Sequence, residues 1–372
     1  MRILAVDVGT GTQDILLFDS EREPENSLKL VMPSPTMLVA EEVRRATAER
    51  RPLLLTGVTM GGGPSAWATE AHRQAGLPVY ATPEAARSFN DDLEWVRRHM
   101  GVEIIGEDEA NALKGVARVE LRDFDLNAIR KAFAAFGVPL EIDALAVAVF
   151  DHGAAPPNMS DRLFRLNYLA DRLSAEGRLA AFAFPADRIP PVMTRLQAVA
   201  ATARRQTNLP LVVMDTAPAA ILGAQEDPRV QAEPDAVIVN VGNFHTLAFR
   251  FYEGRIISLF EHHTGLLNQT KLERWLEELV TGTISHERVF AEMGHGALVR
   301  EARPGALRFL AAIGPRRSLL RGSRLPVYFA VPHGDQMLAG CFGLIRACAE
   351  VVPEWAEPIR AGLDGRGAKS LW

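Results

Sequence analysis

The sequence is poor in cysteine, which restricts both disulfide and metal chemistry. Only two cysteines, Cys341 and Cys348, occur in 372 residues. They lie seven residues apart on one predicted helix, about 10.5 Å apart along its axis, which is too far for a disulfide. Their spacing also matches no zinc or iron–sulfur pattern. We therefore expect both thiols to be buried and inert.

Long apolar runs and an excess of positive charge are missing as well. No apolar stretch is long enough to cross a bilayer, and no basic segment followed by an apolar run opens the chain. The formal net charge is −5, which gives no overall attraction to nucleic acid or to acidic membranes. We therefore expect a cytoplasmic protein that binds neither nucleic acid nor membrane.

The composition that is present is that of a globular protein. Hydrophobic residues make up 48% and charged residues 23% of the chain, close to the globular average. A chain of this length is too long for one ordinary core, so two domains are expected. We place them at residues 1–225 and 226–372, with a more charged, inserted region near residues 84–142.

The order of apolar segments predicts an α/β fold with an internal repeat. The first half opens with three short strands at residues 2–8, 14–19 and 28–32. Helices and strands then alternate, and the strands at 52–56, 78–80 and 144–150 indicate one mostly parallel sheet covered by helices. The second half repeats the opening, with strands at residues 236–241, 246–251 and 255–260. A structural duplication is the economical explanation.

A glycine-containing turn follows the first strand and could hold phosphate. Glycine permits a tight turn whose backbone N–H groups converge on an anionic oxygen. Asp7, at the end of the strand, could hold Mg²⁺ or orient a nucleophile. An ordinary hairpin turn with a capping aspartate is the alternative. The candidate phosphate-binding residues of this turn are Gly9, Thr10, Gly11 and Thr12.

The sequence from Asp7 to Thr12, followed by a strand ending in Phe18-Asp19, resembles the first phosphate motif of the actin, Hsp70 and sugar-kinase superfamily. The resemblance implies two duplicated ribonuclease H-like (actin-like ATPase) domains with a cleft between them. It also implies ATP and Mg²⁺ as cofactors, with Asp7 at the metal. In that superfamily a related motif opens the second domain, and the residues in the matching place are Gly242, Asn243, His245 and Thr246.

Two further segments resemble parts of the same superfamily. The segment 214–224 is similar to a carbohydrate-kinase stretch in which an aspartate opens an alanine-rich helix and acts as general base. Asp215 is the matching position, and a helix N-cap is the alternative role. The segment 309–317 stands where the adenosine-binding strand end is expected, with Gly314 and Arg316 as the candidate contacts. The sequence departs from the pattern at Gln13 and Asp14 and at the bulky residues 243–245.

Several polar segments follow predicted strands, where ligands of open α/β sheets bind. Three glycines before a helix could form an anion or substrate loop, or a flexible connection. Histidines recur beside glycine or an acidic residue, and they could contact substrate or phosphate, bind a transition metal, or satisfy turn backbone groups. The candidate substrate-binding residues are Gly62, Gly63, Asp151, His152, His263, His333 and Asp335.

Over its whole length the sequence is similar to an uncharacterised prokaryotic family often labelled pyruvate formate-lyase activating enzyme-like. A radical enzyme of that type needs three closely spaced cysteines for its cluster, and this chain has two in total. We therefore reject the chemistry in that label.

Two functions remain for the predicted fold, with a relic that binds no nucleotide as a third. In the first, the protein is an ATP- and Mg²⁺-dependent kinase acting on a small hydroxylated metabolite. In the second, it is a nucleotide-driven switch or activator ATPase acting on a protein partner. The partner is thus a small molecule or a protein, and a homodimer is left open.

Overall fold

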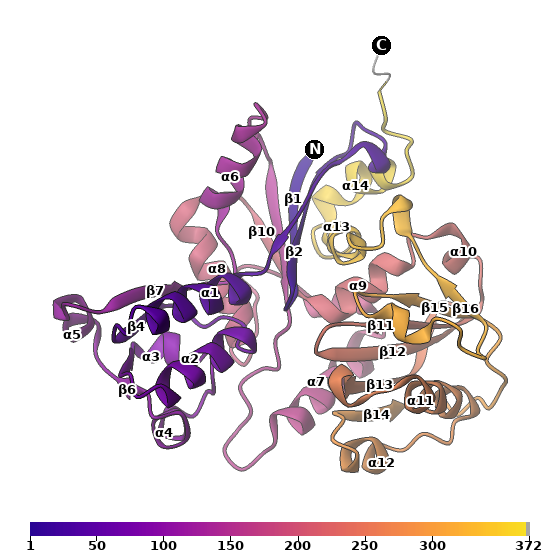
Figure 1. The fold of residues 1–372 in the computed structure, drawn as a ribbon. Coiled ribbons are helices and arrows are strands. Elements are labelled where there is room, and N and C mark those ends of the chain that lie inside the picture. Colours follow the sequence, from indigo (N-terminus) through magenta and orange to yellow (C-terminus); the bar gives the residue numbers. More distant parts are fainter. Residues whose placement is uncertain (370–372) are drawn as a thin grey trace.

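The computed structural model describes residues 1–369 of the chain. Its first sheet has six strands in the order β3-β2-β1-β8-β10-β9 (Figure 1). The strands of this sheet are β1 (Arg2–Val8), β2 (Thr12–Asp19), β3 (Leu28–Pro33), β8 (Ala144–Val149), β9 (Ala183–Pro185) and β10 (Leu211–Asp215). Every residue of β8 and β10 is buried, as expected for central strands that are covered on both faces.

The second sheet also has six strands, in the order β14-β13-β12-β11-β15-β16. Its strands are β11 (Asp235–Val241), β12 (His245–Tyr252), β13 (Arg255–His263), β14 (Gly296–Val299), β15 (Leu310–Ile313) and β16 (Val327–Phe329). In both sheets an antiparallel meander leads to parallel strands. β1 pairs antiparallel with β2 and parallel with β8, as β11 does with β12 and β15. The repeated ribonuclease H-like order confirms the predicted duplication and α/β class.

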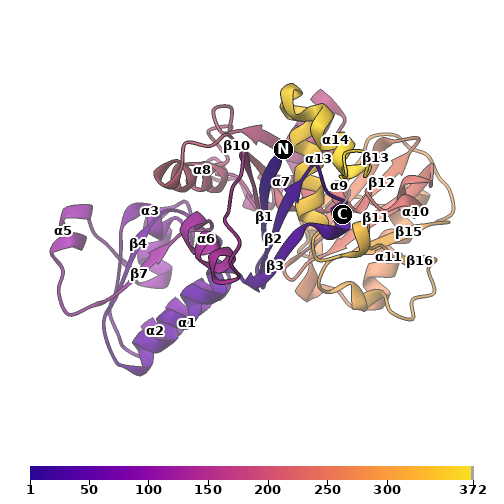
Figure 2. The same cartoon turned by 90° about the horizontal axis from the view of Figure 1, so that it is seen from above.

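A smaller parallel sheet lies apart from the other two. Figure 2 shows it at one side of the molecule together with α1 and α2. Its order is β6-β5-β4-β7, and its strands are β4 (Leu53–Gly57), β5 (Val79–Ala81), β6 (Glu103–Ile104) and β7 (Ala117–Leu121). The prediction that the strands at 52–56 and 78–80 join the main sheet is therefore wrong, because alternating helices and strands do not reveal which sheet a strand joins. The domain limit at residue 225 stays a prediction.

Helices cover the three sheets and separate the two larger ones. Those before β8 are α1 (Pro35–Ala48), α2 (Pro64–Gln74), α3 (Pro83–Ala86), α4 (Leu93–Trp95), α5 (Glu107–Ala112) and α6 (Leu126–Ala135). Those after β8 are α7 (Asp161–Glu176), α8 (Thr194–Gln206), α9 (Thr216–Ala224), α10 (Pro228–Gln231), α11 (Gln269–Thr281), α12 (His286–Ala291), α13 (Ala339–Val351) and α14 (Ala356–Leu363). Local signals set several helix ends: Asp125 caps α6 and Gly177, at φ +69°, ends α7.

The helices α9 and α13 lie between the two larger sheets, and one hydrophobic cluster joins side chains of both helices and both sheets (Figure 1). Their backbones touch because each has a glycine at the crossing. A Cβ atom at Gly223 would overlap the backbone of Ala339, and one at Gly343 would overlap the backbone of Ala219. The small residues that the sequence places on these helices therefore set the spacing of the two sheets.

Both cysteines behave as the sequence predicts. Cys341 and Cys348 lie on α13, and both are buried and free. Burial raises the pKa of the Cys348 thiol to about 12. Within residues 1–369, every helix is too short or too polar to cross a lipid bilayer.

The helix crossing gives a prediction about stability. We expect Gly223→Ala to lower the free energy of unfolding by about 3 kcal/mol, because the methyl group must push α13 away. Urea denaturation of both proteins measures this difference. Gly265→Ala is the matched control, since a Cβ at Gly265 meets nothing within 4 Å. Equal stability of the two variants would contradict the close packing.

Candidate functional site

A cleft of about 330 Å³ lies where loops of all three sheets meet. The strand–turn of the first sheet contributes one wall, and that of the second sheet contributes the wall opposite. The loop 61–63 and residues 87–91, from the third sheet, close a further side. The lining residues used below are Asp7, Gly9, Thr10, Thr12, Asp14, Gly62, Gly63, Phe150, Asp151, His152, Arg195, Thr216, Gly242, Asn243, Phe244, His245 and Gly314.

The two turns have the same backbone geometry and face each other. In the first, the Gly9 amide donates to the Thr12 carbonyl at 2.9 Å, and in the second the Gly242 amide donates to the His245 carbonyl at 2.9 Å. A Cβ atom built on Gly11 would lie 2.8 Å from Nδ2 of Asn243. The turns are therefore in contact across the cleft, and glycine at position 11 leaves the room for that contact.

The peptide groups of the first turn are oriented by Ser34. Its hydroxyl donates to the carbonyl of Thr10, and its amide donates to the carbonyl of Gly11. Because C=O and N–H point in opposite directions across a trans peptide, the Gly11 amide points away from Ser34. Within residues 1–369 the amides of Thr10 and Gly11 donate to no protein acceptor. Free backbone amides of a turn can bind an anionic oxygen.

Two carboxylates, Asp7 and Asp14, lie opposite each other on β1 and β2 at the cleft. Burial raises the pKa of Asp7 to about 7, and the charge of Asp215 adds to this, while the hydrogen bond from Thr216 opposes it. Burial, and then the charge of Asp7, raises the pKa of Asp14 to about 8. Oδ1 of Asp14 is buried without a protein hydrogen-bond partner. A divalent cation would relieve this repulsion, because Mg²⁺ prefers carboxylate oxygens.

Of the two residues predicted to contact adenosine, only one lines the cleft. Gly314, at φ +95°, lines it, and a Cβ there would overlap Oδ1 of Asn240. Arg316 lies outside the lining, and its amide donates to the carbonyl of Val241 at 3.0 Å. Close to this end, a Cβ at Gly340 on α13 would overlap the carboxylate of Asp7.

Asp215 is buried and does not line the cleft. Both of its carboxylate oxygens accept hydrogen bonds from the guanidinium of Arg165, and Oδ1 also accepts the Ala217 amide at 3.0 Å. The geometry is that of a capped helix and a buried ion pair, which is the alternative to a general base. Both oxygens of Asp215 are therefore occupied by protein donors.

Arg165 joins the two larger sheets. Its Nε donates to Oε2 of Glu261 at 3.1 Å, and its Nη1 donates to the carbonyl of Asp151 at 2.8 Å. Its guanidinium lies 4.1 Å from the ring centroid of Phe150. Arg165 is 1% exposed, so its charge is stable only because carboxylates from both sheets neutralise it.

The bulky second turn makes contacts that small residues could not make. Phe244 packs on Trp67 of α2, with ring centroids 5.3 Å apart, and lies against Gly63. His245 stacks on Phe150, with centroids 4.1 Å apart. The departures from the superfamily pattern at these positions therefore connect the second sheet to the third sheet and to the end of β8.

Four histidines gather at the end of the cleft. His152 and His245 line it, His295 precedes β14, and His263 ends β13. Ring centroids of His295 lie 5.0 Å from those of His245 and 4.9 Å from those of His263. The expectation that His263 follows its strand is wrong, because β13 extends through His263.

Other predicted site residues have structural partners outside the cleft lining. Thr246 is fully buried, and its hydroxyl lies 2.8 Å from that of Thr264. The ring of His333 packs at a tilt on Phe342, with centroids 4.5 Å apart, and Nε2 of His333 lies 3.6 Å from Oε2 of Glu226. Asp335 accepts the amide of Met337 at 3.0 Å. The predicted residues that do line the cleft come from the end of β1, the first turn, the second turn, the 61–63 loop, the end of β8 and the end of β15.

The sequence interpretation missed residues whose partners are distant along the chain. Arg165 and Glu261, separated by 96 positions, carry no local signal of their pairing. The place of Asp14 at the site could have been predicted from the sequence, because the short turn between β1 and β2 pairs Asp14 directly with Asp7. Arg195, which binds Asp123 beside the 61–63 loop, also gives no local signal.

Two ribonuclease H-like sheets facing each other across a cleft with paired phosphate-type turns define the actin-like ATPase class of folds. The chain belongs to the family described as "Putative pyruvate format-lyase activating enzyme (DUF1786)", whose profile matches residues 60–319. The radical chemistry in that description does not fit, because the two cysteines of the sequence are both buried on α13.

Among solved structures, the chain is similar to three proteins at low identity. The ethanolamine utilization protein EutJ from Carboxydothermus hydrogenoformans is 11% identical, with a TM-score of 0.33, over 92% of this chain and 89% of that one. The activator of the 2-hydroxyisocaproyl-CoA dehydratase from Clostridium difficile, with bound ADPNP, is 8% identical, with a TM-score of 0.36, over 100% of both chains. The ROK hexokinase from Thermus thermophilus is 14% identical, with a TM-score of 0.30, over 96% of this chain and 100% of that one. No curated protein matches the sequence.

The raised pKa of Asp14 gives a prediction about pH dependence. The folded state holds this proton up to about pH 8, whereas the unfolded state loses it near pH 4, so the folded state loses stability as the pH rises between them. Asp14→Asn cannot ionise. We expect its free energy of unfolding, relative to the unmodified protein, to rise by about 1–3 kcal/mol from about pH 5 to about pH 8.

Urea denaturation without divalent cations at several pH values measures this change. Asp187→Asn is the control, because Asp187 is exposed and outside the cleft lining. A stability difference for Asp14→Asn that does not vary with pH would show that Asp14 ionises normally in the folded protein.

The Arg165 bridge gives a second prediction for this site. We expect Arg165→Met to lower the free energy of unfolding by about 3–5 kcal/mol, because Asp215 and Glu261 then lose their buried partner. Arg178→Met is the control, since Arg178 is exposed and its ion pairs with Glu176 and Glu350 contribute less than about 1 kcal/mol. Chemical denaturation measures the free energy of unfolding of both variants. Similar decreases in the two variants would refute the structural role of the bridge.

Proposed function

We propose that the cleft binds a nucleoside triphosphate with Mg²⁺ and that the protein is a kinase or ATPase. The observation that carries this proposal is the contact between the two matching turns, with the free amides of Thr10 and Gly11 at one side and Asn243 at the other. Two turns of this kind on opposite walls suit a chain of phosphate groups. A fold relic would have no reason to keep both turns open.

The residues of the cleft divide by their chemistry. Asp7 and Asp14 would hold the metal, which supplies charge neutralisation to the phosphates. The turn amides and the Thr10 and Thr12 hydroxyls would orient the phosphates, and Gly314 would admit the nucleoside. Thr216 donates to Oδ1 of Asp7 and so fixes the orientation of that carboxylate.

Phosphoryl transfer to a small hydroxylated substrate is the form of the activity that we favour. The 61–63 loop and Arg195 extend the cleft beyond the two turns, on the side of Asp151 and His152. Arg195 donates to both oxygens of Asp123 and to the carbonyl of Phe150 at 2.6 Å, so this side is rigid. A rigid polar compartment beside the phosphates suits positioning of a second substrate.

A nucleotide-driven switch acting on a protein partner is the second candidate. The binding of Asp215 by Arg165 favours it, because the residue that matches the kinase general base is not free. Phosphoryl transfer depends mainly on positioning and charge neutralisation, so the missing base does not by itself exclude a kinase.

Nucleotide binding gives the test of this proposal. We expect a non-hydrolysable ATP analogue to bind in the presence of Mg²⁺, and Asp7→Asn to weaken this binding by about tenfold or more. Binding without Mg²⁺ should change little in that variant. Isothermal titration calorimetry measures both affinities, with Asp187→Asn as control. No binding to the unmodified protein, with or without Mg²⁺, would refute the proposal.

A further inference from the structure

The histidine cluster at the end of the cleft has a geometry that nucleotide binding does not require. His152 follows β8 of the first sheet, whereas His245 and His295 come from β12 and the segment before β14 of the second. One ring nitrogen from each of these three lies within 4.8 Å of the others. Zn–N bonds of about 2.0–2.1 Å would bring such nitrogens to about 3.4 Å from one another. Small side-chain rotations supply that difference.

A buried carboxylate stands behind two of these rings. Oε1 of Glu261 lies 3.4 Å from Nδ1 of His245 and 3.6 Å from Nδ1 of His295. Glu261 is 0% exposed and is itself held by Arg165. A carboxylate at Nδ1 orients an imidazole so that Nε2 faces a metal, as in the carboxylate–histidine–metal arrangement of known sites.

An imidazole must be neutral to bind a metal, and burial lowers the pKa of three rings of the cluster. Burial lowers the pKa of His295 to about 3, against the opposing charge of Glu261, and burial lowers the pKa of His263 to about 4. Burial also holds the pKa of His152 well below its usual range.

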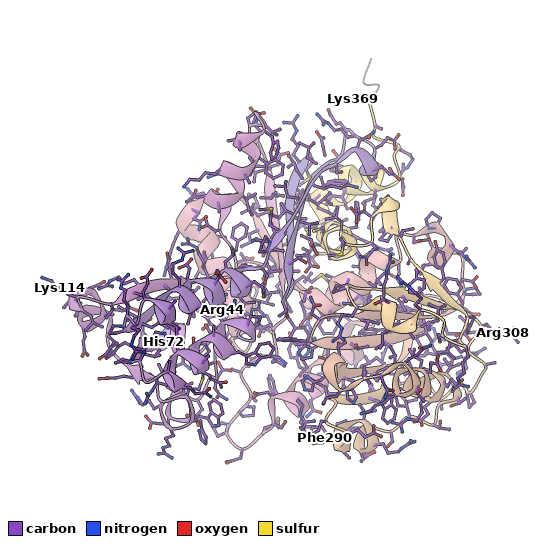
Figure 3. The ribbon with its side chains drawn as sticks, viewed as in Figure 1. Arg44, His72, Lys114, Phe290, Arg308 and Lys369 are labelled. Carbon is purple, nitrogen blue, oxygen red and sulfur yellow. The ribbon has the colours of Figure 1, made fainter. Side chains whose placement is uncertain are left out.

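Three ring nitrogens of the cluster lack a hydrogen-bond partner. Both ring nitrogens of His295 and Nδ1 of His245 are buried without a protein hydrogen bond among the residues described. His72, which lies in the third-sheet part of the molecule (Figure 3), has one nitrogen paired, because its Nδ1 lies 2.8 Å from the hydroxyl of Thr47, while its Nε2 also has no protein partner among the residues described. Each unpaired buried group costs about 1–3 kcal/mol. A metal ion would give Nε2 of His295 a partner and leave its Nδ1 toward Glu261.

We infer that His152, His245 and His295 form a binding site for a divalent transition metal, with Glu261 as the positioning carboxylate. Imidazole ligands suit Zn²⁺ and its neighbours, whereas Mg²⁺ requires oxygen ligands. The site is therefore chemically distinct from the carboxylate pair Asp7 and Asp14. Because His152 and His245 line the cleft while His295 is fully buried, the fourth coordination position faces the cleft. It would take water or an anionic oxygen of a ligand there.

Metal titration of the untagged, chelator-treated protein tests this inference without any activity assay. We expect one Zn²⁺ or Co²⁺ per chain, bound with a dissociation constant below about 1 µM, and visible ligand-field bands of a four-coordinate site with Co²⁺. His295→Gln and His152→Gln should each weaken binding by about 100-fold. Glu261→Gln should weaken it by about 10–100-fold, as loss of a carboxylate behind a ligand does.

His99→Gln is the matched control, because His99 is exposed and stacks on Trp95 far from the cluster. Circular dichroism and the unfolding midpoint show whether each variant folds. If His295→Gln does not fold, His152→Gln decides, since His152 is only partly buried at the cleft. Unchanged metal affinity in the folded variants, or no stoichiometric binding by the unmodified protein, would overturn the site and leave water as the partner of these rings. Neither result depends on nucleotide binding.

Discussion

The arrangement of this molecule depends on one buried guanidinium. Arg165 binds Asp215 at the end of β10 and Glu261 within β13, so a single side chain holds strand ends of both larger sheets. A buried charge is costly unless it is paired, and here each pair is completed only when the sheets stand at this distance. The same distance brings the two turns into contact and the imidazoles of both sheets together. The bridge and the close crossing of α9 and α13 therefore together fix how the residues of the two sheets meet.

The two pairs of buried carboxylates near these strand ends differ in whether a basic side chain accompanies them. Asp215 and Glu261 share one cation, the guanidinium of Arg165. Asp7 and Asp14, by contrast, face each other with no basic partner among the residues described. Burying two repelling carboxylates reduces stability, and folded proteins retain such conflicts mainly at functional sites. The charge pattern therefore distinguishes a structural ion pair from a ligand site, although both consist of buried acidic residues near the same strand ends.

The sequence predicts the fold well because its signals are local. Apolar periodicity locates the opening strands of both halves to within about three residues, and a strand–turn–strand order seen twice indicates the duplication. The glycine turns are local too. Sheet membership is not local: β4 and β5 have the pattern of main-sheet strands, but they pair with each other, and β4 pairs with β7. The partners of Arg165 lie 50 and 96 positions away, and no spacing rule predicts them. The ion pair of Asp215 with Arg165 could not be predicted either, because the local context of Asp215 is the same whether or not an arginine reaches it.

The two matching turns have diverged in what they present to the cleft. The first offers small residues and free amides, whereas the second offers Phe244, which touches Trp67, and His245, which joins the imidazole cluster. The second turn is therefore attached to the third sheet and to the end of β8 through side chains. His245 therefore belongs both to the second turn and to the imidazole cluster, where its ring centroid lies 5.3 Å from that of His152 and 5.0 Å from that of His295. The bulky residues of this turn thus fix its position through contacts with two other parts of the molecule, which the small residues of the first turn could not make.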